Sequence, residues 1–158
     1  MKMVVNISLK WIKMIINNKK IYFEYEVLEE YSAGLCLFGS EVKSLREGKA
    51  SINEAYCIIE NNELFIRNMH ISEYKQSSHY NHEVLRDKKL LLNRQEINKI
   101  QKKVKEKGFT IAPIKIYTNK KGLFKIDIGL CRGKKSFDKK NSIKEKDLDR
   151  ELKRNLIN

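Results

Sequence analysis

The strongest constraint on the fold is an alternating segment late in the chain. Apolar residues at positions 124, 126, 128 and 130 alternate there with Lys125, Asp127 and Gly129. This period of two is typical of a strand that buries one face. The β-prone segment 109–118 precedes it, with Asn119-Lys120-Lys121-Gly122 between them, so the two segments predict a β-hairpin. The sole proline, Pro113, predicts an edge or a bulge in the first strand, because proline cannot donate a hydrogen bond to the sheet.

Earlier segments predict further strands. Residues 21–31 and 33–38 are rich in Tyr, Phe, Val and Leu, and Ser32-Ala33-Gly34 stands between them. We interpret them as a strand, a turn and a strand. Residues 55–60 and 64–68 form a predicted hairpin around Asn61-Asn62-Glu63.

Two segments predict helices. Residues 40–46 begin with a capping serine and precede Gly48, which indicates a short helix. Residues 94–107 place Ile97, Ile100 and Val104 on one face before Gly108, which suits a left-handed cap. Residues 70–88 show no sustained period and are expected to form a long loop.

These elements predict a mainly β fold with two or three short helices. About six short antiparallel strands suit a small β-barrel of the oligonucleotide-binding type. At 158 residues, the chain has room for one such domain. We expect an N-terminal extension at 1–17, a barrel domain at 18–131 and a basic tail at 132–158. Met14 is an alternative start of translation, so residues 1–13 need not belong to the native protein.

The C-terminal tail is strongly basic. Residues 132–158 contain ten Lys or Arg against five Asp or Glu, and they have too few apolar residues for a core of their own. Leu148, Leu152 and Leu156 recur every four residues, so a helix is within reach. We nevertheless expect the free tail to be disordered and to fold on a polyanionic partner.

Charge favours nucleic acid as that partner. The formal net charge is +13, which attracts phosphate-rich molecules. The three cysteines, Cys36, Cys57 and Cys131, are far apart among apolar neighbours, which indicates buried reduced thiols in a cytosolic protein. The first 14 residues lack the uninterrupted apolar run of a signal peptide or membrane span.

The sequence offers little sign of catalysis. It has no phosphate-binding glycine loop, nucleophile elbow or paired-carboxylate motif. His70, His79 and His82 could bind a metal together with Cys57, but no carboxylate pair completes a ligand set. We therefore expect no enzyme activity, no metal and no cofactor. Basic residues beside Tyr22, Phe23 and Tyr25 instead suit phosphate neutralisation and base stacking.

Five ordered blocks of sequence carry a resemblance to a known family. They are Asn18-Lys19-Lys20-Ile21-Tyr22-Phe23-Glu24-Tyr25, Gly39-Ser40-Glu41-Val42-Lys43-Ser44-Leu45-Arg46-Glu47-Gly48-Lys49-Ala50, Asn68-Met69-His70-Ile71-Ser72, Arg86-Asp87-Lys88-Lys89-Leu90-Leu91-Leu92, and Arg132-Gly133-Lys134-Lys135 followed by Asp138-Lys139. In this order they resemble the SsrA-binding protein (SmpB) family, from about Asn18 to the end of the chain.

This resemblance implies a cytoplasmic, monomeric RNA-binding adaptor without a membrane partner. Its partners would be the tRNA-like part of transfer-messenger RNA (tmRNA, or SsrA RNA) and stalled ribosomes awaiting trans-translation. The residues implied to face RNA, or to support that face, are Asn18, Lys19, Lys20, Tyr25, Glu41, Lys43, Arg46, Lys49, Lys134 and Lys135. Glu41 is expected to orient its neighbours, because a phosphate would repel its carboxylate.

The resemblance also implies a role for the tail in the empty decoding site and mRNA channel. Gly133 begins the expected hinge, and Phe137, Asp138, Lys139 and Lys140 align with the segment that contacts the ribosome. Phe137 keeps a stacking face but lacks the polar atom of the His or Tyr common in relatives. Lys140 replaces an arginine, which changes a bidentate phosphate contact into a point charge.

Two other functions remain open at this point. A generic ribosomal or single-strand RNA-binding barrel would explain the charge and the fold, but not the ordered blocks. A metal-dependent nuclease would use the three histidines.

Overall fold

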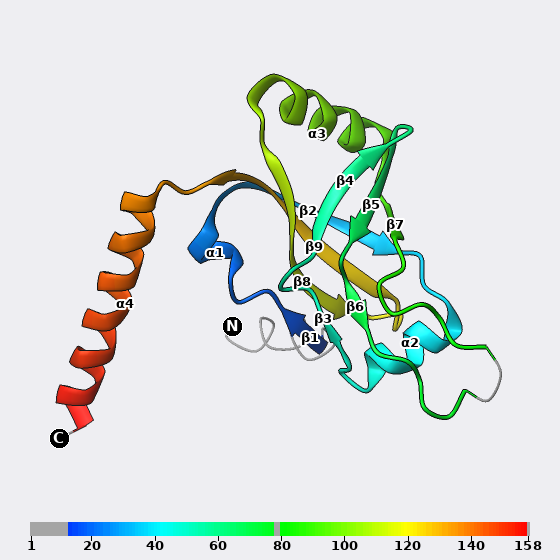
Figure 1. Ribbon diagram of the computed structural model, residues 1–158, viewed down its shortest axis with the longest axis horizontal. Coiled ribbons are helices and arrows are strands. Elements are labelled where there is room, and N and C mark those ends of the chain that lie inside the picture. Colours follow the sequence, from blue (N-terminus) through cyan, green and yellow to red (C-terminus); the bar gives the residue numbers. More distant parts are fainter. Residues whose placement is uncertain (1–12, 78–79, 158) are drawn as a thin grey trace, which may run out of the picture.

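The structure is a computed structural model that describes residues 13–77 and 80–157 (Figure 1). Its strands are β1 (Lys13–Asn17), β2 (Tyr25–Leu35), β3 (Ala50–Ser51), β4 (Tyr56–Glu60), β5 (Glu63–Arg67), β6 (His70–Ile71), β7 (Lys88–Leu91), β8 (Thr110–Thr118) and β9 (Phe124–Gly133). Its helices are α1 (Ile21–Glu24), α2 (Gly39–Arg46), α3 (Arg94–Lys107) and α4 (Ser136–Ile157).

Antiparallel pairing closes a small barrel. Within the described residues, the sheet order is β1-β8-β4-β5-β7-β2-β9, and β9 also pairs with β8. A six-strand ring therefore closes on itself, as the sequence predicted, with β1 added alongside β8. The shortest pairing in the ring is between β4 and β8, where Cys57 lies opposite Ile111.

The predicted turn at residues 32–34 is wrong, because β2 is one continuous strand of 11 residues. It pairs with β9 along most of its length, from Tyr25 opposite Gly133 to Gly34 opposite Lys125. A bulge between Val27 and Glu29 bends it around the barrel. A Cβ at Gly129 would lie 3.1 Å from a side-chain atom of Val27, so glycine permits this close approach.

The β8–β9 hairpin and its bulge are confirmed. The register shifts between Pro113 and Lys115, which accommodates the missing amide hydrogen of the proline. The hairpin between β4 and β5 is also present, but Glu63 belongs to β5. Asn61 and Asn62 therefore form a two-residue turn, and both have positive φ, as a type I′ turn requires.

The N-terminal boundary was placed too late. Residues 13–17, assigned to the extension, form β1 and pair with β8 from Lys13 opposite Thr118 to Asn17 opposite Lys115. The sequence did not reveal that residues 13–17 pair with β8, because polar and apolar residues do not alternate regularly in this segment. Residues 1–12 lie outside the described part of the chain.

The long loop predicted at 70–88 is shorter than expected. His70 and Ile71 form β6 and pair with β3, while Lys88 begins β7, which lies between β5 and β2. Helix α3 is as predicted, with a capping box at Asn93 and with Gly108 in the left-handed region at φ 63°. Ile100 is fully buried and joins α3 to the main core.

Two of the three cysteines are buried as expected. Burial raises the pKa of the Cys57 and Cys131 thiols, so both stay neutral. Cys36 is exposed, which corrects the prediction. It follows directly after β2, where the chain leaves the sheet toward α2.

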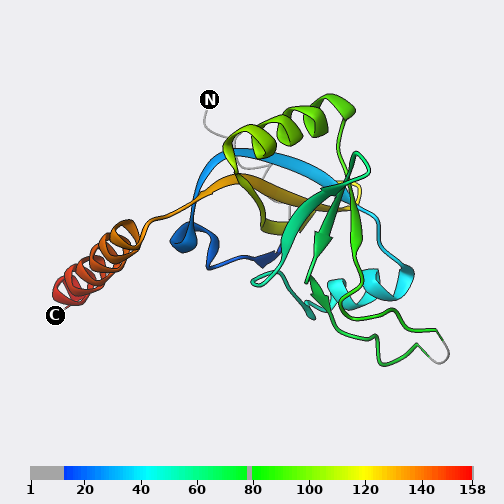
Figure 2. The same ribbon diagram turned by 45° about the horizontal axis from the view of Figure 1, so that its top comes forward.

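The tail is a helix in this structure, whereas we expected disorder. Helix α4 spans 22 residues and extends away from the barrel (Figures 1 and 2). Asp138 lies in its first turn, where a carboxylate is favourable, and Arg154 lies in its last turn. Its leucines remain exposed, at 59% for Leu148 and Leu152 and 85% for Leu156. Burial of these leucines therefore does not account for this helix.

Candidate nucleic-acid interface

Asn18 fixes the corner where the chain leaves β1. Its side-chain amide donates to the Pro113 carbonyl at 2.9 Å, and its Oδ1 accepts from the Lys20 backbone amide at 3.1 Å. Its own backbone amide donates to the Ile114 carbonyl at 2.8 Å. Asn18 is 7% exposed, so it holds the following lysines in place and is not itself a surface contact.

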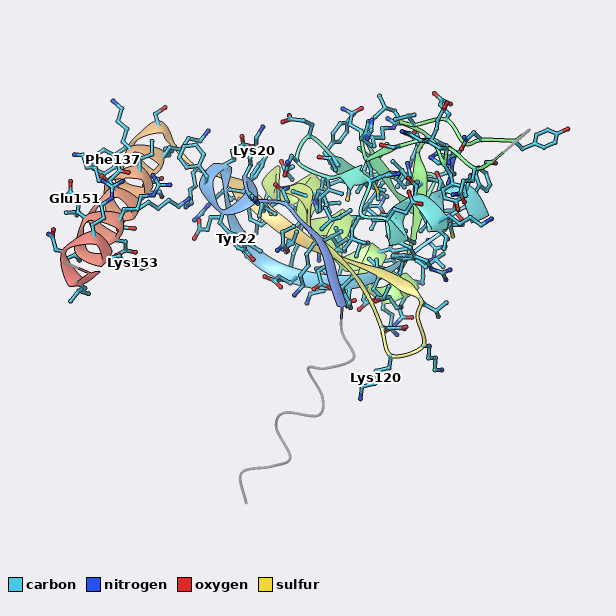
Figure 3. All side chains as sticks on the ribbon, turned by 90° about the horizontal axis from the view of Figure 1, so that it is seen from below. Lys20, Tyr22, Lys120, Phe137, Glu151 and Lys153 are labelled. Carbon is cyan, nitrogen blue, oxygen red and sulfur yellow. The ribbon has the colours of Figure 1, made fainter. Side chains whose placement is uncertain are left out.

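The segment after this corner presents cations and one aromatic ring. Lys19 and Lys20 are exposed, and Lys20 forms an ion pair with Glu54. Tyr25 is only partly exposed and packs against the small buried cluster around Ile21. Tyr22, 56% exposed, is the freer stacking surface (Figure 3). The sequence pattern did not distinguish these two tyrosines, because the turn of α1 decides which of them points outward.

Lys134 joins the end of the barrel to the same corner. Its backbone amide donates to the Glu24 carbonyl at 3.0 Å, and its ammonium donates to the Tyr22 carbonyl at 2.9 Å. Gly133, the expected hinge residue, is the last residue of β9 and lies opposite Tyr25. Lys135 is exposed beside them. The structure therefore brings together the sequence-predicted residues of α1 and of the β9 end.

Helix α2 carries the second predicted group at the other end of the barrel (Figures 1 and 2). Lys43, Arg46 and Lys49 are exposed, with the Lys43 ammonium 5.4 Å from the centre of the Tyr74 ring. Lys49 pairs with Glu47 at 2.6 Å. The segment between α2 and β4 runs back toward α1, where Glu54 meets Lys20. The two basic groups are thus separate surfaces connected by this segment.

Glu41 is a structural carboxylate, as its chemistry suggested. It is fully buried on α2 and accepts a hydrogen bond from the Phe38 amide at 2.7 Å. Arg86 donates to both of its oxygens, at 2.7 and 3.1 Å. Burial would raise the pKa of Glu41, but these hydrogen bonds and the charges of Arg86 and Lys88 outweigh it and lower the pKa.

Arg86 and Lys88 are the supporting residues that the sequence analysis did not place in the site. Lys88 is fully buried, and its ammonium donates to the Arg86 carbonyl at 2.7 Å and the Met69 carbonyl at 3.2 Å. It lies 3.8 Å from Glu41. Burial lowers the pKa of Lys88, and the charge of Glu41 opposes that shift only in part. These residues attach α2 to the segment before β7.

The predicted ribosome-contacting residues lie at the start of α4. Phe137, Asp138 and Lys140 are exposed and Lys139 is partly exposed. Phe137 is 73% exposed, and Figure 3 shows it on α4, apart from the barrel. Two contacts orient this helix on the barrel: the Lys134 ammonium lies 3.4 Å from the Ser142 hydroxyl, and Lys146 lies 5.9 Å from the Phe23 ring centre.

The histidines do not form a metal site in the described residues. His70 is exposed, and His82 is buried between Ser40 and the Ile71 carbonyl, at 2.9 and 3.0 Å. His79 lies outside the described part of the chain. No group of three His, Cys, Asp or Glu residues in that part is placed to hold a metal ion. Likewise, none of its helices is long and apolar enough to span a membrane.

A closed antiparallel barrel with basic surfaces and an extended basic helix defines a small β-barrel protein of the nucleic-acid-binding class. Residues 15–158 match the family described as SmpB protein, and the chain belongs to that family.

Two similar proteins illustrate how far this relationship extends. An SsrA-binding protein from Cytophaga hutchinsonii is 52% identical over 139 residues, which are 88% of this chain and 91% of that protein. An SsrA-binding protein from Treponema denticola is 47% identical over 145 residues, covering 92% and 94%.

A solved structure gives the same result. A chain from the structure "tmRNA-SmpB: a journey to the center of the bacterial ribosome" is 40% identical, with a TM-score of 0.65. The match covers 78% of this chain and 87% of that one. Both the barrel architecture and the family are therefore shared with a protein solved in a ribosomal context.

Proposed function

We propose that this chain is a non-catalytic RNA-binding adaptor that binds tmRNA and delivers it to stalled ribosomes for trans-translation. The observation that carries the proposal is the family match, which extends from residue 15 through the whole basic tail. Relatives named for binding SsrA cover nearly the same length. The action on the ribosome places this adaptor in the cytoplasm.

The barrel supplies the RNA-binding part of this proposal. Lys19, Lys20 and Tyr22 form one exposed group, and Lys43 and Arg46 form the other. Lysine and arginine neutralise phosphates, while an exposed ring gives a base a surface to stack on. Buried Asn18 and Glu41 hold these groups in position, which supports a preformed RNA surface.

The tail supplies the ribosome-binding part. Helix α4 touches the barrel near α1 and then extends away from it (Figures 1 and 2). Phe137 is free to stack on a base, and Lys139 and Lys140 can meet phosphates near it. A separate projecting cationic segment suits entry into an empty decoding site and mRNA channel, while the barrel keeps hold of tmRNA.

The deciding experiment is a competition measurement. The full chain is titrated with its own organism's tmRNA in the presence of bulk transfer RNA, across a salt series. Selective tmRNA binding at physiological salt supports the adaptor. Equal binding to both RNAs that collapses as salt rises would identify a generic RNA-binding barrel instead.

A further inference from the structure

A hollow of about 480 Å³ lies between α2 and the loop that connects β6 to β7. The described parts of this loop, residues 72–77 and 80–87, lie beside α2 at the end of the barrel away from α4 (Figures 1 and 2). The hollow is within the range of about 300–1,000 Å³ that small-molecule pockets occupy. Its lining includes Phe38, Ser40, Lys43, Tyr74, Asn81 and His82.

We propose that this hollow is a binding slot for one unstacked RNA base, with Phe38 as its stacking surface and Lys43 as the contact for the adjoining phosphate. The proposal rests on the RNA-binding function above; Lys43 is among the residues predicted from the sequence, and Phe38 is a contact additional to them. Single-stranded regions of RNA offer such bases, which proteins hold on aromatic side chains.

Phe38 has the properties of a prepared stacking platform. Phe38, the residue directly before α2, is 55% exposed. The Arg86 guanidinium covers the ring at 4.1 Å from its centre, so the exposed surface is the opposite face and the edge. Arg86 donates to both carboxylate oxygens of Glu41, which fixes the guanidinium plane against one face of the Phe38 ring.

Hydrogen bonds also hold Tyr74, a second aromatic residue that lines the hollow. Asn81 accepts a hydrogen bond from the Tyr74 amide at 3.1 Å and donates to the Tyr74 carbonyl at 3.0 Å. The Lys43 ammonium lies over the Tyr74 ring. A second aromatic surface and a cation therefore face the same hollow as Phe38. This combination favours a flat ligand joined to an anion.

His82 holds the loop against α2. The Ile71 carbonyl can only accept, so His82 Nε2 carries the hydrogen and Nδ1 accepts from the Ser40 hydroxyl. Both ring nitrogens of His82 thus form hydrogen bonds, and the imidazole links the loop to α2. Glu83 also lines the hollow, and its carboxylate would disfavour a phosphate on that side. The phosphate is therefore expected on the Lys43 side.

The test compares two substitutions of the same ring in the full chain, with tmRNA as the ligand. Phe38→Leu keeps an apolar side chain but removes the flat face, whereas Phe38→Tyr keeps the face. We expect Phe38→Leu to weaken tmRNA binding about tenfold, equivalent to about 1.4 kcal/mol, and Phe38→Tyr to bind like the wild type. Tyr56→Ala, which removes a 40% exposed ring on β4, is the control and should bind normally.

Ultraviolet crosslinking of the same complex gives an independent readout. Mass spectrometry should find a nucleotide adduct on the peptide that carries Phe38 or Tyr74. If the wild type binds tmRNA selectively but Phe38→Leu binds equally well and neither peptide carries an adduct, the slot is overturned while the adaptor function stands. If the wild type shows no selective binding, both proposals are overturned together.

Discussion

The Arg86 guanidinium and the Glu41 carboxylate form a bidentate pair across 45 residues of sequence, at 2.7 and 3.1 Å. The carboxylate is fully buried, while the arginine side chain is 26% exposed. The pair joins α2 to the segment before β7, and the Arg86 guanidinium lies 4.1 Å from the centre of the Phe38 ring. Together with the hydrogen bonds of His82, it attaches this end of the barrel to α2.

Glu41→Gln should reduce the free energy of unfolding by about 3–5 kcal/mol, because it leaves Arg86 and buried Lys88 without their counter-charge. Urea unfolding at neutral pH measures the loss. Glu47→Gln, at the exposed residue that follows α2, serves as the control and should change stability by less than about 0.5 kcal/mol. A Glu41→Gln variant as stable as this control would show that the Glu41–Arg86 pair contributes little to the free energy of unfolding.

Glu29 should make folding sensitive to acid. The hydrogen bond from Lys103, followed by that from Tyr31, lowers the pKa of Glu29 from 4.5 to about 2. A lowered pKa in the folded state means that the stabilisation is complete above about pH 4.5 and is lost as pH falls toward 2. Because the side chain is 32% exposed, water screens the pair, and we expect only about 1 kcal/mol.

Thermal unfolding of Glu29→Gln between pH 2 and pH 6 tests this expectation. The variant should be less stable than the wild type near pH 6, and the difference should vanish near pH 2. Glu30→Gln, the exposed neighbour on β2, is the matched control. A constant difference across the whole range would mean that ionisation of Glu29 does not cause the effect.

The double substitution Lys43→Glu with Arg46→Glu should weaken tmRNA binding and make its salt dependence shallower. Each phosphate contact contributes a slope of about 0.9 in the plot of log affinity against log salt, so we expect a reduction of up to about two. Lys102→Glu with Lys105→Glu makes the same charge change on α3. An equal effect of this control would show that net charge, and not the α2 surface, governs binding.

Lys134 should set the direction of α4, since its ammonium bonds the Tyr22 carbonyl and approaches Ser142. Lys134→Met removes these contacts but keeps the aliphatic stem. We expect greater motion of α4 relative to the barrel in NMR relaxation, with barrel stability changed by less than about 1 kcal/mol. Lys135→Met, at an exposed neighbour, should leave the motion unchanged; if both variants behave alike, Lys134 does not orient the tail.

Local signals predicted the elements that depend on local interactions. The turn residues 119–122 and the alternating strand after them specify the β8–β9 hairpin, and Gly108 ends α3 where a left-handed cap was expected. Both signals lie within a few residues of the structure that they determine. The repulsion expected between phosphate and the Glu41 carboxylate led to a supporting role for this residue, and Glu41 is buried and hydrogen-bonded to Arg86.

Elements that depend on distant pairing were predicted less well. Gly34 resembled a turn residue, but it lies within β2. A Cβ at this position would lie 3.3 Å from the Cβ of Leu91, so the glycine permits a close approach of the two strands. Strand β7 begins with a lysine, and Lys88 can be buried only because Glu41 and two carbonyls surround it. None of these partners is visible in the local sequence, so Lys88 was assigned to the end of the predicted loop and no strand was predicted at residues 89–91.

Removal of the chain after Lys135 should separate the two parts of the proposed function. Helix α4 contacts the barrel near α1, and its leucines are exposed, so the truncated barrel should keep its melting temperature within a few degrees. Binding to tmRNA should persist, because the α1 and α2 groups remain. Tagging of stalled chains in a reconstituted translation system should be lost, because the truncated chain has nothing to place in the decoding site. The substitutions Leu148→Ala and Leu152→Ala in the full-length chain are the control for changes within α4. Tagging by the truncated chain would contradict this division between barrel and tail.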